Sequence, residues 1–181
     1  MRKLISAVER APLRVVVVTM DSHPGGALTR AEGLLRRELP NLDLTMHAAD
    51  EWGGDPNALR ACHAAIAQAD IVIATMLFLE DHIQAVLPAL AARRDGCHAM
   101  ICLLSAGEVV RLTRIGKFNM SAEAAGAIAW LKRMRGKSGS GSNARGQMKM
   151  LRQVPKLLKF IPGTAQDVRA YFLALQYWLA G

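Results

Sequence analysis

A strand-sized apolar run near the start of the chain reads Leu13-Arg14-Val15-Val16-Val17-Val18-Thr19-Met20. Three similar runs follow it, at Leu42–Ala48, Ile71–Met76 and Ala99–Leu104. Helical patterns separate the four runs, near Leu28–Leu39, Asn57–Ala69 and Asp81–Arg94. Alternation of short β-branched runs with longer helical segments is typical of βαβ units. It therefore predicts the α/β class, with the strands parallel in one sheet.

The order of the strands follows from their hydrophobicity. The first and third runs are apolar nearly throughout, as expected of central strands that helices cover on both faces. Leu42-Asp43-Leu44-Thr45-Met46 alternates apolar and polar residues, which indicates an edge strand. Right-handed crossovers make 2-1-3-4 the simplest order. We predict a flavodoxin-like or Rossmann-like parallel sheet of about four strands over residues 12–105, after a short tail at residues 1–11.

Beyond Leu104 the pattern becomes helical. Residues Ala106–Met134 read as two helices that break near Gly116, and Gly136–Asn143 is a Gly/Ser tract that predicts a flexible loop. An amphipathic helix begins near Thr164, with an apolar stripe at Val168, Tyr171, Phe172, Leu175, Trp178 and Leu179. We expect an all-helical extension over residues 106–181, without a further strand, and interpret the abrupt end after this stripe as the cut end of a longer protein.

Composition excludes several protein classes. The 181 residues include 23 Lys and Arg against 15 Asp and Glu, a net charge of +8, and 51% hydrophobic residues, which is far from the composition of disordered chains. Three cysteines without a pairing pattern indicate a reducing compartment. No signal peptide and no run of about 18 apolar residues is present, so we expect a cytoplasmic protein without a membrane span.

The usual cofactor and catalytic motifs are absent from the sequence. Gly25-Gly26 is too little for a dinucleotide fingerprint, and Gly136-Lys137-Ser138 lacks the first glycine and the preceding strand of a phosphate loop. Cysteine and histidine spacings do not match zinc sites, and no nucleophile elbow is present. We therefore predict no metal site, no catalytic residue and no cofactor in this chain.

Topology still predicts where a ligand could lie. In open parallel sheets, ligands bind off the carboxyl ends of the strands. Polar and carboxylate side chains follow all four predicted strands, and the candidates for a ligand-binding rim are Asp21, His23, Phe78, Glu80 and Glu108. The alternative is that the polar residues are ordinary helix caps and that Phe78 and Trp52 plug the top of the core.

A second candidate surface is basic. Between Glu123 and Asp167 the chain has nine basic residues and no acidic one. The candidates for a partner surface in this run are Lys132, Arg133, Arg135, Lys149, Arg152, Lys156 and Lys159. Acidic protein surfaces or anionic headgroups would suit it, and a merely solvated helical face is the alternative. Nucleic-acid binding would call for aromatic residues within the run, and it has none.

Several longer strings carry a family resemblance. They are Thr19–His23, Ala69–Ile83, Ser105–Glu108, Thr113–Phe118, Met150–Arg152 with Pro155-Lys156, and Ile161–Phe172 with Tyr177–Leu179. These strings resemble the N-terminal region of the large, porphyrin-binding (H) subunit of magnesium chelatase, over nearly the whole chain. The Ala-rich helices and the many arginines favour a bacterium that makes bacteriochlorophyll over a plant.

The resemblance implies a function for the complete protein. It would bind protoporphyrin IX and, with two ATPase-type subunits, insert Mg²⁺ at the expense of ATP, as a ligase of (bacterio)chlorophyll biosynthesis. Its implied partners are the remainder of the large subunit, the two ATPase-type subunits and a downstream methyltransferase, with peripheral contact at photosynthetic membranes. This chain alone would be an inactive structural or assembly domain. An independent flavodoxin-like ligand binder and a basic nucleic-acid-binding module stay open as alternatives.

Overall fold

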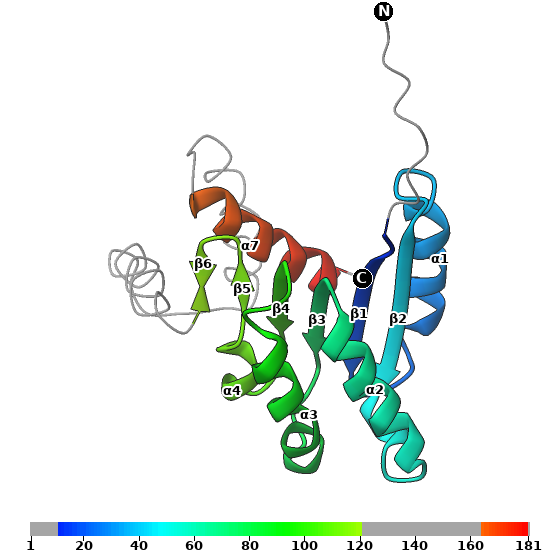
Figure 1. Ribbon diagram of the computed structural model, residues 1–181. Helices are drawn as coiled ribbons and strands as arrows, with labels where there is room; N and C mark the ends of the chain where they lie inside the picture. The colour runs from blue at the N-terminus through cyan, green and yellow to red at the C-terminus, as the bar shows by residue number, and fades with distance from the viewer. Residues whose placement is uncertain (1–10, 121–163, 181) are drawn as a thin grey trace, which may run out of the picture.

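The computed structural model describes residues 11–120 and 164–180. Its centre is a sheet in the order β2-β1-β3-β4-β5-β6 (Figure 1). The four long strands are parallel to their neighbours: β1 (Leu13–Thr19), β2 (Leu42–Ala48), β3 (Ile71–Thr75) and β4 (Ala99–Leu103). The α/β class and the predicted order 2-1-3-4 of the parallel strands are therefore confirmed.

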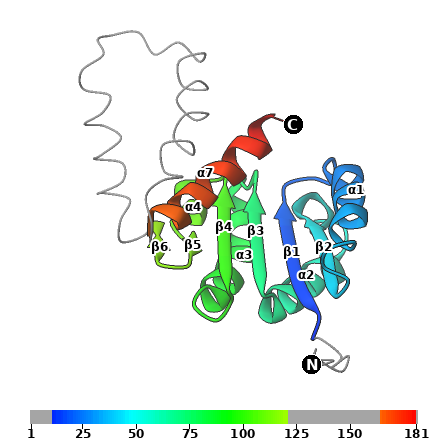
Figure 2. The ribbon, with the colours of Figure 1, turned by 90° about the horizontal axis from the view of Figure 1, so that it is seen from above.

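Helices pack on both faces of the sheet (Figure 2). They are α1 (Gly25–Leu35), the short helix η1 (Ala49–Glu51), α2 (Pro56–Gln68), α3 (Glu80–Arg93), α4 (Gly107–Val110) and α7 (Thr164–Ala180). The main core lies between the sheet and α2, α3 and α4, where Val18, Val72 and Cys102 meet Ile66 and Leu90. Side chains at alternate positions of the strands point to the opposite face, where α7 forms a second, smaller core.

The prediction of no strand after Leu104 was wrong. A short hairpin of β5 (Arg114–Ile115) and β6 (Phe118–Asn119) adds two antiparallel strands to β4. Two-residue strands carry no periodicity, and only the single-turn helix α4 precedes them where a full helix was expected. Gly116, which we interpreted as a break between helices, is the turn of this hairpin and has a left-handed φ of 55°.

Long-range contacts connect the hairpin region to α3 and α7. The Arg94 Nε donates to the carbonyl of Leu112 at 3.1 Å, and the Arg114 Nε donates to the carbonyl of Arg94 at 3.0 Å. The backbone N–H of Lys117 donates to Asp167 Oδ2 at 2.9 Å, which joins the hairpin turn to α7. The hairpin is thus connected to Arg94, at the end of α3, and to Asp167, in α7.

The predicted apolar stripe of the last helix faces the second core. Tyr171 is buried, its hydroxyl donates to the carbonyl of Cys102 at 3.5 Å, and its ring lies 5.7 Å from that of Phe118. Val168, Phe172, Leu175 and Trp178 pack around it. Leu179 departs from the pattern, because it is 39% exposed.

Several sequence predictions lie outside the described residues. They are the tail at residues 1–10, the helix expected up to Met134, the Gly/Ser loop at Gly136–Asn143 and the basic run from Lys132 to Lys159. These stay predictions.

Replacing Gly116 by Ala should destabilise the chain. A Cβ at this position would lie 2.7 Å from Asp167 Oδ2, and its φ of 55° disfavours any side chain. We expect a loss of about 1–3 kcal/mol in the free energy of unfolding, measured by urea titration. Gly33→Ala is the control, because that position in α1 is open and alanine should there stabilise by about 0.5–1 kcal/mol. Equal stability of the two variants would contradict this account.

Candidate functional site

The five predicted rim residues lie at one edge of the sheet, where the parallel strands end. Asp21 and His23 follow β1, Phe78 and Glu80 follow β3, and Glu108 follows β4. Among these five, all within the described residues, the hydrogen bonding is local: the backbone N–H of His23 donates to Asp21 Oδ1 at 3.0 Å. Topology therefore brings the candidates to one edge, but their side chains do not form a bonded cluster.

Phe78 and Trp52 differ in burial. Trp52 is 8% exposed and packs in the main core, as the plug interpretation predicted. Phe78 is 53% exposed, so for this residue the plug interpretation was wrong. Glu80 is the first residue of α3, and its Oε1 accepts a hydrogen bond from Gln84 Nε2 at 2.6 Å. Both residues lie in the same helix, one turn apart and exposed.

Hydrogen bonds tie together the loops that follow β3 and β4. The backbone N–H of Met76 donates to the carbonyl of Leu104 at 3.1 Å, and that of Ala106 donates to the carbonyl of Leu77 at 2.9 Å. Ser105 Oγ accepts from the N–H of Leu77 at 3.1 Å and donates to the carbonyl of Leu103 at 2.9 Å. The two loops therefore form one rigid unit at the centre of the edge.

Both loops contain a strained residue. Met76 has φ 61° and Leu104 has φ 45°, the left-handed region that side chains with a Cβ disfavour. Each costs about 1–2 kcal/mol relative to an ordinary conformation. The sequence offers no glycine at either position, so neither strained residue could be recognised before the structure.

Among the residues that the structure describes, four buried polar atoms near this edge make no hydrogen bond. They are His47 Nε2, Trp52 Nε1, Thr75 Oγ1 and His82 Nδ1. The rings of Trp52 and His82 contact each other edge to face, with centroids 5.9 Å apart. Burial lowers the pKa of His47, against a weaker opposing effect of Glu51. The rim prediction did not include His47, Thr75 or His82. A polar residue that closes an otherwise apolar strand, as Thr75 does, is the signal that could have found one of them.

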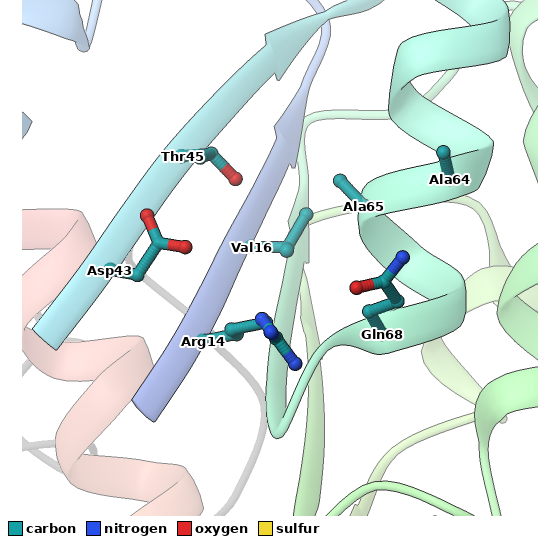
Figure 3. Close-up of a pocket in the computed structure, with 7 residues that line it drawn as sticks. All are labelled: Arg14, Val16, Asp43, Thr45, Ala64, Ala65 and Gln68. Carbon is teal, nitrogen blue, oxygen red and sulfur yellow. The ribbon is translucent and has the colours of Figure 1, made fainter. Parts of the chain in front are cut away.

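A hollow lies elsewhere, beside α2 and the first halves of β1 and β2 (Figure 3). Its volume is about 220 Å³, and Arg14, Asp43, Thr45 and Gln68 provide its polar lining. Pockets that enclose drug-sized ligands measure about 300–1,000 Å³. The hollow is smaller than this and lies away from the carboxyl ends of the strands, so it does not coincide with the predicted rim.

The described residues contain no group of three His, Cys, Asp or Glu side chains that could hold a metal ion. All three cysteines are buried and free, and burial raises the pKa of Cys62 and of Cys102 to about 12. The thiols of these two are therefore protonated at neutral pH and serve as core residues. Within residues 11–120 and 164–180, no helix is both long enough and apolar enough to cross a membrane.

Comparison with known proteins identifies similar sequences. Residues 14–172 match the family described as "Domain of unknown function (DUF3479)". The chain is 46% identical over 168 residues to the H subunit of magnesium chelatase from Rhodobacter capsulatus and, equally, to that from Cereibacter sphaeroides. It is 30% identical over 173 residues to the chloroplastic ChlH subunit of magnesium chelatase from Oryza sativa subsp. indica. These matches cover 92% and 93% of this chain, but only 14% and 12% of the relatives.

Stability of the chain should fall on acidification because of His47. Its lowered pKa means that below the ordinary value of 6.5 the unfolded chain binds a proton that the folded chain does not. The free energy of unfolding therefore decreases as the pH falls below about 6.5. We expect His47→Gln to make this decrease smaller, measured by urea titration between pH 7.5 and 5. The control is His98→Gln, because His98 is exposed. If His98→Gln reduced the loss of stability on acidification as much as His47→Gln does, His47 would not be its cause.

Proposed function

The chain belongs to the DUF3479 family, and we propose that it forms part of the H subunit of a magnesium chelatase. The observation that carries the proposal is the 46% identity to two bacterial H subunits over 92% of the chain. The family resemblance inferred from the sequence is thereby confirmed. Neither an independent ligand binder nor a nucleic-acid-binding module is favoured by these matches. The chain spans 14% of the length of these relatives, so the activity of the whole protein is part of the proposal.

We propose that the complete protein binds protoporphyrin IX and that two ATPase-type subunits use ATP to drive insertion of Mg²⁺. Insertion replaces two pyrrole protons by the metal ion, so the reaction needs a base and a site that excludes water. The names of the relatives support a role in this reaction. The remaining proposed partners are the rest of the large subunit and a downstream methyltransferase, in the cytoplasm or at the surface of photosynthetic membranes.

Within that complex, we propose a structural or assembly role for this chain. Two features of the described residues support this role. The hollow beside α2 is only about 220 Å³, below the volume of about 300–1,000 Å³ that encloses even a drug-sized ligand. The rim carboxylates of Asp21, Glu80 and Glu108 follow three different strands, and the hydrogen bonds of Asp21 and Glu80 are local, to His23 and Gln84. Such an edge can contact another surface more readily than it can enclose a porphyrin.

A chimeric protein tests the proposed function. In the Rhodobacter capsulatus relative, this chain would replace the segment that it matches, which is 14% of that protein. We expect the chimera to insert Mg²⁺ into protoporphyrin IX, with both ATPase-type subunits present, at a rate within about tenfold of the parent. The control is the parent with the segment deleted. A folded chimera that binds porphyrin but is as inactive as the deletion would overturn the proposal.

Rim substitutions test whether this edge contributes to the reaction. In the chimera, we expect Asp21→Ala, His23→Ala, Phe78→Ala, Glu80→Ala and Glu108→Ala to reduce the rate of Mg²⁺ insertion without unfolding the protein. Glu38→Ala is the matched control, because Glu38 is an exposed carboxylate that lies away from the edge, just beyond α1. Parent-like rates from all five variants would show that these residues are caps and surface side chains only.

A further inference from the structure

Two large apolar side chains are exposed side by side at the carboxyl edge of the sheet. Phe78 is 53% and Leu79 is 54% exposed, and both lie between the end of β3 and the start of α3. The residue before them, Leu77, is completely buried in the main core. The chain therefore passes from the buried core to the exposed surface between Leu77 and Phe78, although Phe78 and Leu79 are also apolar.

The local backbone holds Phe78 and Leu79 outward. Leu77 is fixed on both sides, because its N–H donates to Ser105 Oγ and its carbonyl accepts from Ala106. Leu79 is the N-cap of α3, and its carbonyl accepts from the N–H of Ile83 at 3.0 Å. These hydrogen bonds fix the backbone on both sides of Phe78, so the pair follows a well-defined path of the chain at this edge.

Local stability is reduced at three residues around the pair. Met76 and the neighbouring Leu104 adopt left-handed conformations that glycine would adopt without strain. Leu79 provides no side-chain cap for α3, where Ser, Thr, Asp or Asn would stabilise the helix by about 0.5–2 kcal/mol. Departures from local preference that gather at one place are expected at functional sites.

The carboxyl edge of the sheet is acidic, whereas the chain as a whole has a net charge of +8. The four segments that follow the parallel strands, residues 20–25, 49–56, 76–82 and 104–110, contain seven of the 15 acidic residues and no Lys or Arg. The acidic residues are Asp21, Asp50, Glu51, Asp55, Glu80, Asp81 and Glu108. An apolar centre within a charged rim is the usual composition of a protein interface. The complementary surface would present an apolar pocket surrounded by Lys and Arg.

We propose that Phe78 and Leu79 anchor a docking surface, and that its occupant is a basic surface of the same polypeptide, in the part of the large subunit outside this chain. This inference rests on the proposed function, since the chain corresponds to only 14% of its bacterial relatives. Stable association of separate proteins usually buries about 1,200–2,000 Å², far more than two side chains provide. Within one polypeptide, high effective concentration makes such a small anchor sufficient.

Limited proteolysis of the chimeric protein tests the docking surface. The variant is Phe78→Ser combined with Leu79→Ser, and the control is Leu34→Ser, because Leu34 is 61% exposed on α1. We expect cleavage between this domain and the rest of the polypeptide to become about tenfold faster in the double variant, as when an interface anchor is truncated, and to stay unchanged in the control.

Asp81→Lys, which leaves the apolar pair intact, is the second variant. It should also accelerate cleavage at low ionic strength, and high salt should reduce the difference because exposed charges are screened. Unchanged cleavage in both variants would overturn the proposal. So would unchanged cleavage together with weaker binding of the ATPase-type subunits, because the occupant would then be a separate protein. Both of these outcomes concern the docking surface alone. The proposed function would still stand as long as the chimera without these substitutions inserts Mg²⁺ normally.

Discussion

The parallel pairing of β1 with β3 is the interaction on which the rest of the structure depends. Val15 to Val18 lie opposite Ile71 to Ala74, and Val17, Val18, Val72 and Ala74 are completely buried. Asp70 fixes the start of this pair: its Oδ2 accepts from the N–H of Arg14 at 2.8 Å, and its carbonyl accepts from the N–H of His98, at the start of β4. This arrangement sets the register between β1 and β3 and places the start of β4 beside them.

The four parallel strands end in register, with Thr19 beside Ala48 and Thr75 beside Leu103, so the loops that carry the candidate residues lie together at their carboxyl ends. The hydrogen bond between Met76 and Leu104 joins the two central loops there, at the expense of two left-handed residues. Phe78 and Leu79 are about half exposed, so an interface that covers the rest of both side chains would contribute about 1–1.5 kcal/mol each, together comparable to the combined cost of that strain. The proposed assembly surface would account for both the strain at this edge and the exposed apolar pair.

Sequence alone predicted the parallel sheet well and the edge only in outline. Continuous β-branched runs predicted β1 and β3 to within one residue, because such runs suit few structures other than buried strands. The hairpin around Gly116 could not be predicted, because side chains far away in the sequence, such as Arg94, hold it. Topology alone placed the rim residues at one edge. The exposure of Phe78 depends on tertiary packing, as does the burial of the Thr75 hydroxyl without a hydrogen-bond partner, and local patterns do not encode such packing.

The most direct test of the account is an experimental structure of a complete magnesium-chelatase large subunit that carries this domain. The measurement is the solvent exposure of Phe78 and Leu79, now 53% and 54%, within the whole polypeptide. An assembly surface predicts that both side chains are buried against a neighbouring region of that polypeptide, with Lys or Arg side chains facing Glu80 and Asp81. The account would be contradicted if both side chains remained in solvent, or if porphyrin lay against them in place of protein.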